Sequence, residues 1–220
     1  MFEGPFFRDR RDAGRRLADA LAHLRTRHPL VLALPRGGVP VAFEVGKALD
    51  AELDLLFVRK LGAPGHEELG IGAVVDGADP QLVLNEEIAR HVGAGPDYIK
   101  EELRRQLGEI DRRRQAYVGD RDPVPVAGRT VVVVDDGIAT GGTVKAALRG
   151  VRKAGPAHLV LAVPVAPAET IAPLRGECDE LVCLRSPEAF YAVGAHYADF
   201  TQTEDDEVVA LLERAHRLAI

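Results

Sequence analysis

Apolar residues recur along the chain first at helical spacing and then in short continuous runs. Residues 13–24 place apolar side chains three and four positions apart among arginines, which predicts an amphipathic first helix. The run PLVLALP at 29–35 predicts a buried strand, and residues 41–49 return to the helical period. The next apolar run, LDLLFVR at 53–59, predicts a second strand. This order of strand, helix and strand is typical of parallel strands joined by a right-handed crossover.

The second half of the chain repeats the same alternation. Strands are predicted at 130–134, 158–163 and 180–184, and helices at 142–154 and 168–174. Continuous β-branched runs of this kind are typical of strands that are covered on both faces. We therefore predict an α/β fold with a mostly parallel twisted sheet flanked by helices, a Rossmann-like core. Ligands are expected beyond the carboxyl ends of its strands.

The middle of the chain departs from this alternation. Residues 60–77 are rich in glycine and predict a long mobile loop, although the apolar segments at 73–75 and 81–84 could pair as a hairpin. Residues 85–118 turn helical and charged and are broken once by GAGP. They form a solvated helix, a small hood over a site, or a dimer face. We take 1–220 as a single domain that contains this helical insertion.

The composition and net charge favour some classes of function over others. Hydrophobic residues make up 46% of the 220 positions, which is enough for a full-sized core. The formal net charge of -6 and the pI of about 5.7 do not favour nucleic acid as a partner, although residues 112–114 form a short arginine run. Small-molecule chemistry is the better expectation.

Cysteine content and the distribution of apolar residues bear on the compartment. The chain has two cysteines, Cys178 and Cys183, which favours neither a disulfide framework nor a structural zinc site. Residues 1–28 lack a cationic segment followed by an apolar one, and no apolar run reaches the roughly 20 residues that a membrane span needs. We expect a soluble, cytoplasmic protein that does not associate with a membrane.

The stretch VVVVDDGIATGGT at 131–143 combines three kinds of residue in one order. A buried strand ends in Asp135 and Asp136, and a glycine and threonine turn leads into the next helix. Free amides at a helix start form an anion site, and glycines allow a phosphate to approach them closely. The expected phosphate contacts are Gly137, Ala139, Thr140, Gly141, Gly142 and Thr143.

The two adjacent carboxylates need a partner other than the phosphate, which they would repel. Vicinal hydroxyls or a divalent cation fit them, and ribose 5-phosphate supplies hydroxyls near its phosphate. Other phosphate loops fit less well: a Walker loop needs lysine before its final threonine, where Gly142 stands, and the dinucleotide fingerprint G-x-G-x-x-G is missing. Hydrolysis of a phosphate ester lacks a nucleophile, because Ser186 is not in a nucleophile elbow.

The same stretch resembles the phosphoribosyl pyrophosphate motif of the type I phosphoribosyltransferases, and the resemblance extends over about 28–205. Within that family the chain is similar to a less characterised bacterial branch without an assigned base. The resemblance implies a homodimer that uses Mg²⁺. The ion would be held mostly by pyrophosphate and ribose oxygens, with water linking it to Asp135 or Asp136.

The resemblance also implies a site for the pyrophosphate leaving group in LPRGGVP at 34–40. There Arg36 offers a forked donor, Gly37 and Gly38 expose amides, and the family often has a non-proline cis peptide. In FVRKLG the family presents a basic residue to the same group. Since neighbouring side chains on a strand point in opposite directions, only one of Arg59 and Lys60 reaches it, and we favour Lys60.

The glycine-rich run at 60–77 resembles the flexible loop that closes over the reaction in this family and excludes water. His66, Glu67 and Glu68 lie on it. A solvent-exposed loop tip is one interpretation of these three residues. Alternatively, one of them is a general acid or base, and Glu67 and Glu68 are our candidates.

The acceptor stays open. Oxopurine enzymes of the family carry an aspartate in the middle of the phosphate loop, where this chain has Ala139, so the loop is closer to the adenine type. The tail PEAFYAVGAHYADF resembles the base-binding end of the oxopurine enzymes. There Phe190 or Tyr191 would stack on a base and Asp199 would orient nearby groups, or the aromatics belong to the core.

Together these features predict a phosphoribosyltransferase that binds phosphoribosyl pyrophosphate and transfers ribose 5-phosphate to a nitrogen acceptor. A nucleotide-sensing or phosphoribosyl pyrophosphate-sensing regulatory protein without catalysis is the alternative on the same fold.

Overall fold

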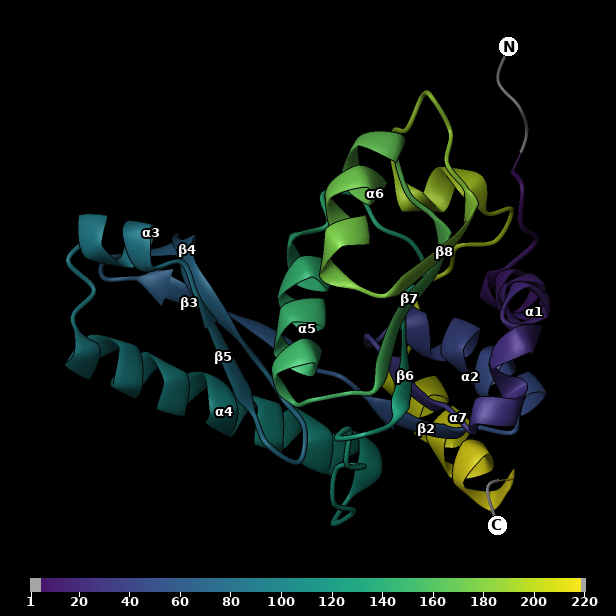
Figure 1. Cartoon of the computed structure of the whole chain (residues 1–220), viewed down its shortest axis with the longest axis horizontal. Coiled ribbons are helices and arrows are strands. Elements are labelled where there is room, and N and C mark those ends of the chain that lie inside the picture. The colour runs from purple at the N-terminus through teal and green to yellow at the C-terminus, as the bar shows by residue number, and fades with distance from the viewer. Residues whose placement is uncertain (1–4, 219–220) are drawn as a thin grey trace.

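The computed structural model describes residues 5–218 and builds them around a five-stranded parallel sheet (Figure 1). The spatial order of its strands is β2 (Glu52–Leu55), β1 (Leu30–Ala33), β6 (Thr130–Val134), β7 (His158–Val165) and β8 (Glu180–Arg185). The predicted α/β fold with a mostly parallel sheet is confirmed. No helix among the described residues combines the length and the apolar character needed to cross a membrane.

Helices cover both faces of this sheet. Successive residues of a strand point to opposite sides, and here both sides carry apolar side chains that pack against helices. Val132 and Val134 pack with one group of helices, and Val131 and Val133 pack with the other. The first group is α1 (Arg10–Ala20), α2 (Gly38–Leu49) and α7 (Asp205–Leu218), and the second is α5 (Gly142–Lys153) and α6 (Ala168–Leu174). Short 3₁₀ turns complete the connections: η1 (Ala22–Arg27), η2 (Arg175–Glu177) and η3 (Val193–His196).

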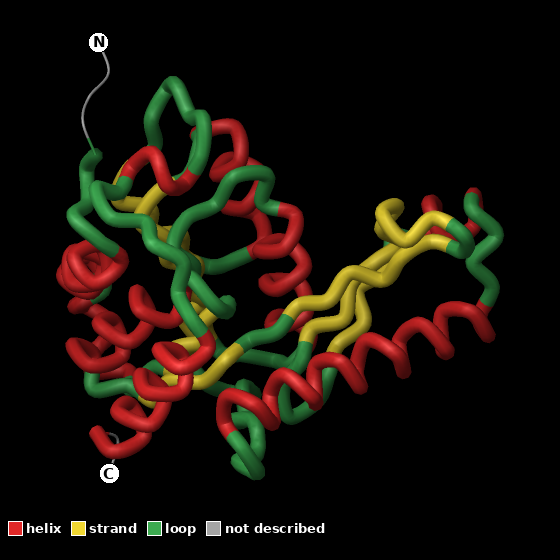
Figure 2. Tube along the Cα trace, turned by 180° about the vertical axis from the view of Figure 1, so that it is seen from behind, coloured by secondary structure: helices red, strands yellow, loops and turns green. Residues whose placement is uncertain are grey.

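Residues 58–118 form an arm that projects from this core (Figures 1 and 2). It contains an antiparallel sheet of three strands in the order β3, β4, β5, and α4 runs along that sheet. Ile110 of α4 belongs to the buried cluster that also contains Leu61 and Ile71 of the sheet, and Tyr98 and Leu103 pack against that cluster. The elements of the arm are β3 (Val58–Ala63), β4 (His66–Val75), β5 (Gln81–Leu84), α3 (Glu86–His91) and α4 (Pro96–Val118).

Two predictions for this region were wrong. The strand expected at 53–59 is two strands, because the chain leaves the parallel sheet after Leu55 and enters the arm at Val58. The mobile loop expected at 60–77 is the hairpin of β3 and β4, and the suggested pairing of 73–75 with 81–84 is present.

The glycines of the hairpin explain the second error. A Cβ atom on Gly72 would lie 3.0 Å from the Leu84 side chain, and one on Gly62 would lie 2.8 Å from Glu67 Cα. These glycines therefore allow strands and side chains to approach closely, and they do not mark a loop.

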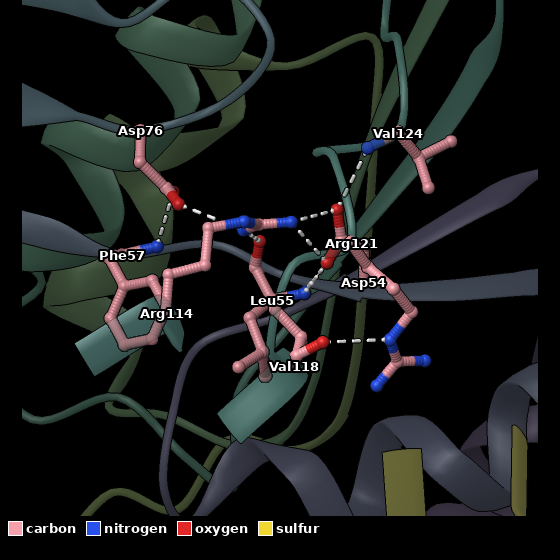
Figure 3. A network of polar contacts seen from close by, with 8 residues as sticks. All are labelled: Asp54, Leu55, Phe57, Asp76, Arg114, Val118, Arg121 and Val124. Carbon is pink, nitrogen blue, oxygen red and sulfur yellow. Dashed lines mark hydrogen bonds and ion pairs between the residues drawn. The ribbon is translucent and has the colours of Figure 1, made fainter. Parts of the chain in front are cut away.

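A buried ion network fastens the root of the arm to the core (Figure 3). Arg114 of α4 donates to both carboxylate oxygens of Asp54 at 2.7 and 2.6 Å, and to Asp76 at 3.0 Å. Asp54 also accepts from the Val124 amide at 2.9 Å, and Asp76 accepts from the Phe57 amide at 2.6 Å. One guanidinium thus serves two carboxylates, and burial raises the pKa of Asp76 to about 7 although Arg114 and the Phe57 amide lower it.

We expect Asp76→Asn to flatten the pH dependence of folding stability. The folded pKa of about 7 lies above the unfolded value of about 3.9, so between these values the folded protein keeps a proton that the unfolded chain has lost. The contribution of Asp76 is therefore present below about pH 4 and is lost as the pH rises through about 7, a change on the order of 4 kcal/mol. Urea unfolding of both proteins across this pH range measures the free energy of unfolding. Equal slopes of that free energy against pH in the two proteins would contradict the raised pKa.

Candidate functional site

Two acidic residues stand at the carboxyl end of the central strand β6, but their side chains meet different surroundings. Asp135 lines a cavity of about 190 Å³ together with Pro35, Arg59 and Thr143. Asp136 instead contacts Arg10 at the start of α1, whose Nε lies 2.8 Å from Asp136 Oδ2. The two carboxyl groups therefore influence each other but differ in their main contacts, a cavity for Asp135 and Arg10 for Asp136.

Both carboxyl groups are largely removed from solvent. Burial and the neighbouring carboxylate of Asp136 raise the pKa of Asp135 well above its usual range. Burial also raises the pKa of Asp136, although the hydrogen bond and the charge of Arg10 lower it. A ligand that brings hydroxyl donors or a cation to Asp135 compensates for the solvation it has lost.

The loop after these acids has the form of an anion site. Ala139, Thr140, Gly142 and Thr143 are exposed at the start of α5. The first hydrogen bond of that helix runs from the Lys145 amide to the Gly141 carbonyl at 2.8 Å, so the amides of 142–144 precede the helical ladder. These donors and the helix dipole fit a phosphate group.

Other parts of the fold hold the loop in shape. Thr170 of α6 donates its hydroxyl to the Ala139 carbonyl at 2.8 Å. Gly137 is buried, and a Cβ atom there would meet the side chain of Val193 in the tail. Gly137 is therefore a packing residue below the exposed part of the loop.

We expect Gly141→Ala to weaken phosphate binding by about tenfold or more. Gly141 has a φ of 77°, which costs other residues energy, and a Cβ atom there would lie 2.7 Å from Thr170 Cγ2. The loop must then move away from α6. Calorimetric titration with ribose 5-phosphate measures the loss. Gly128→Ala is the matched control, because Gly128 has a φ of 73° and open space around it, and an equal loss there would contradict the assignment.

The turn at 35–38 packs directly against the end of β6. The peptide bond between Pro35 and Arg36 is cis, as the family resemblance implied for this loop. A Cβ atom on Gly37 would overlap the Asp136 carboxylate, and one on Gly38 would lie 2.9 Å from the Val134 carbonyl. Both glycines are therefore needed for close packing of the turn on the strand.

One expectation for this turn was wrong. Gly38 is buried, and its amide donates to the Leu34 carbonyl at 3.1 Å, so it does not face a ligand. Turns that close on themselves in this way use an amide internally. Arg36 is partly exposed and pairs with Asp205 of α7 at 3.3 Å, which also accepts the Tyr117 hydroxyl at 2.6 Å.

Arg59 and Lys60 point in different directions, as the strand geometry predicted. Arg59 lines the cavity of about 190 Å³ that contains Pro35 and Asp135, and its Nε donates to Gln106 at 3.1 Å. Lys60 lines a larger cavity of about 790 Å³ beside Thr140 and donates to the Glu68 carbonyl at 2.8 Å. The structure thus places Arg59, and not the favoured Lys60, beside the turn at 35–38.

The candidate acid and base residues lie on the exposed start of β4. The carboxylate of Glu68 lies 3.3 Å from Lys60 Nζ, and that of Glu67 lies 3.7 Å from Arg105 of α4. Neither Glu67 nor Glu68 lines the cavities that contain Asp135 and Thr140. The structure therefore does not bring them to the acids of β6.

The two aromatic candidates of the tail lie in different surroundings. The ring of Phe190 stacks on His196 with centroids 5.4 Å apart, whereas Tyr191 is 75% exposed. Asp199 accepts from the amide and hydroxyl of Thr201 at 2.9 and 2.6 Å. Phe190 is thus engaged within the tail, which agrees with the interpretation of such aromatics as packing residues.

Sequence reasoning missed two arginines near the site. Arg10 contacts Asp136 across 126 positions, and Arg113 of α4 lines the cavity of Asp135. In the sequence they look like polar positions of amphipathic helices. Only the folded arrangement brings them to β6.

Few side chains at the site could hold a metal ion. Among residues 5–218 no three or more His, Cys, Asp and Glu side chains gather in a way that could hold an ion. Asp135 fits a role as one oxygen ligand, direct or through water, while Asp136 is paired with a cation of the protein. A magnesium ion here would take most of its ligands from the oxygens of a substrate and from water.

Known proteins resemble this chain along most of its length. Residues 10–199 match the phosphoribosyl transferase domain. Proteins named "Putative phosphoribosyl transferase" in two Mycobacterium tuberculosis strains, CDC 1551 / Oshkosh and H37Rv, are each 51% identical over 211 residues, which is 96% of this chain and 47% of the relative. The chain spans about half the length of these curated relatives. The crystal structure of TT1426 from Thermus thermophilus is 46% identical, with a TM-score of 0.83 over 94% of this chain and 98% of that one. The chain therefore belongs to the phosphoribosyl transferase domain family.

Proposed function

We propose that the protein binds phosphoribosyl pyrophosphate with Mg²⁺ and transfers ribose 5-phosphate to a nitrogen acceptor, most simply a nucleobase. The bond from C1′ to the pyrophosphate oxygen breaks, a bond from C1′ to nitrogen forms, and the nitrogen loses a proton. Pyrophosphate leaves with the bonding electron pair. The observation that carries this proposal is that Asp135, the exposed loop at 139–143 and the turn at 35–38 lie next to one another beyond the carboxyl ends of β1 and β6.

Each part of the substrate has a matching part of the site. The loop at 139–143 and the start of α5 fit the 5′-phosphate, and Asp135 fits the ribose hydroxyls or a water bound to magnesium. Arg36 and Arg59 lie at the turn where the pyrophosphate would leave, and forked guanidinium donors suit its oxygens. Mg²⁺ would neutralise the charge that develops on pyrophosphate as the bond breaks.

Release of pyrophosphate tests the proposal directly. Purines, pyrimidines and pyridine carboxylates are each incubated with phosphoribosyl pyrophosphate, Mg²⁺ and the protein, and pyrophosphate and nucleotide are quantified. We expect equal amounts of both products with one class of acceptor. Tight binding of phosphoribosyl pyrophosphate without products in the whole panel would instead support the alternative, a regulatory protein that senses this ligand or a nucleotide.

We also propose that residues 1–220 act as one domain and that the helical insertion at 85–118 works together with the strands of the arm. We further propose that the protein works in the cytoplasm as a homodimer. The assembly is measured by light scattering during size-exclusion chromatography. A monomer at all concentrations would contradict the proposed homodimer.

A further inference from the structure

Arg10 is fixed in place by three contacts and has little exposure. Its Nε donates to Asp136 Oδ2 at 2.8 Å, and its Nη1 donates to the Thr201 carbonyl at 2.7 Å. The guanidinium lies over the ring of Phe200, 3.9 Å from the centroid. The side chains of Arg10 and Asp136 are only 11% and 14% exposed. Such a pair is costly to form and costly to break on one side.

Asp136 connects this arginine to the turn at 35–38. Its carboxylate fills the space that a side chain on Gly37 would occupy, so the turn rests directly on it. The Tyr197 hydroxyl donates to the carbonyl of Asp136 and holds its backbone from the tail. Asp136 is thus packed between α1, the tail and the turn.

Asp135 is placed for a different task. It lines the cavity shared by Pro35, Arg59 and Thr143, and its Oδ1 accepts the amide of Asp136 at 2.8 Å. Asp136 does not line that cavity, nor the larger one beside the phosphate loop. Of the two acids, only Asp135 lines the smaller cavity, so it is the one that a ligand there can reach.

We propose that the two acids have separate roles and that Arg10 is a positioning residue. Asp135 takes the ribose hydroxyls, whereas Asp136 is held by Arg10 and sets the position of the turn that receives the pyrophosphate. This inference rests on the proposed function. It reassigns Asp136 from contact with the ligand to support of the turn at 35–38.

Two fragments of the substrate separate these roles. Ribose 5-phosphate probes Asp135 and the loop at 139–143, and magnesium pyrophosphate probes the turn at 35–38. Calorimetric titrations of wild type, Asp135→Asn, Asp136→Asn and Arg10→Gln with each fragment form the experiment. We expect Asp135→Asn to lose about tenfold or more in affinity for ribose 5-phosphate and to keep its affinity for magnesium pyrophosphate. The opposite loss is expected for Asp136→Asn and Arg10→Gln.

Further variants exclude a general effect on folding. Arg10→Lys should recover part of the affinity for magnesium pyrophosphate, because it restores a charge near Asp136 but not both donors. The double variant Arg10→Gln with Asp136→Asn should bind no more weakly than either single variant, since both act through one contact. Arg15→Gln is the matched control on α1, because the Arg15 side chain is 48% exposed and its ion pair with Glu44 is long, at 3.8 Å. It should bind both fragments like wild type.

The outcomes distinguish the inference from the proposed function. If Asp136→Asn loses affinity for ribose 5-phosphate as strongly as Asp135→Asn while Arg10→Gln binds normally, both acids contact the ribose and the division is wrong. An equal loss for both fragments in Asp136→Asn and Arg10→Gln, without rescue in Arg10→Lys, also overturns it. A wild-type protein that binds neither fragment would refute the proposed function itself.

Discussion

Replacing Asp135 and Asp136 together by asparagine is expected to lower the affinity for phosphoribosyl pyrophosphate by about 100-fold. A hydrogen bond to a charged group contributes about 1.5–3 kcal/mol, and the double change removes the charge that attracts hydroxyl donors and the magnesium water. It also removes the partner of Arg10, so the turn at 35–38 loses its support. The two losses act on different ends of the same ligand.

Calorimetric titration with phosphoribosyl pyrophosphate and Mg²⁺ measures this effect. The double change Asp111→Asn with Asp122→Asn is the control, because it alters the net charge equally at exposed positions. Thermal melting of each variant establishes that the titrations are made on folded protein. An affinity within about twofold of wild type would remove the acids of β6 from the site.

The core of the fold is accessible to sequence reasoning because its signals are local. Val131 and Val133 face one side of the sheet and Val132 and Val134 the other, so a continuous β-branched run predicts a strand covered on both faces. The predicted helix at 168–174 agrees with α6, which packs against the loop through Thr170. The motif at 131–143 is equally local, since the strand, the two acids and the exposed loop follow each other without interruption.

The arm was harder to predict because its glycines have two possible meanings. Gly62 and Gly72 suggest mobility in sequence, but in the structure they allow close packing in the hairpin of β3 and β4. Composition alone cannot separate these roles, since both depend on the absence of a side chain.

The contacts around the acids are absent from local patterns for another reason. Arg10 precedes Asp136 by 126 positions, so nothing in the spacing of charges predicts their ion pair. The arginine run at 112–114 illustrates the same limit. Arg112 and Arg113 pair with Glu109 near the surface, whereas Arg114 is buried against two aspartates. The run is therefore not a uniform basic patch.

Arg114→Leu is expected to destabilise the protein by about 3–5 kcal/mol, the largest effect on folding that we predict. Leucine donates no hydrogen bond and leaves Asp54 and Asp76 buried without their shared cation. Removing one partner of such a network costs more than the network contributes, because the remaining charges stay out of water. The root of the arm should then loosen from the end of β2.

Urea unfolding followed by circular dichroism measures this loss, and Arg112→Leu is the control from the same run. Arg112 is 68% exposed and pairs with Glu109 on its own helix, so its replacement should change stability by less than about 1 kcal/mol. Hydrogen exchange of the amides of Phe57 and Val124, which donate to the two aspartates, reports where the structure opens. Faster exchange at both amides in Arg114→Leu, and not in Arg112→Leu, is expected if the network fastens the arm to the core. Similar stabilities for the two variants would mean that the surrounding apolar contacts hold the arm without it.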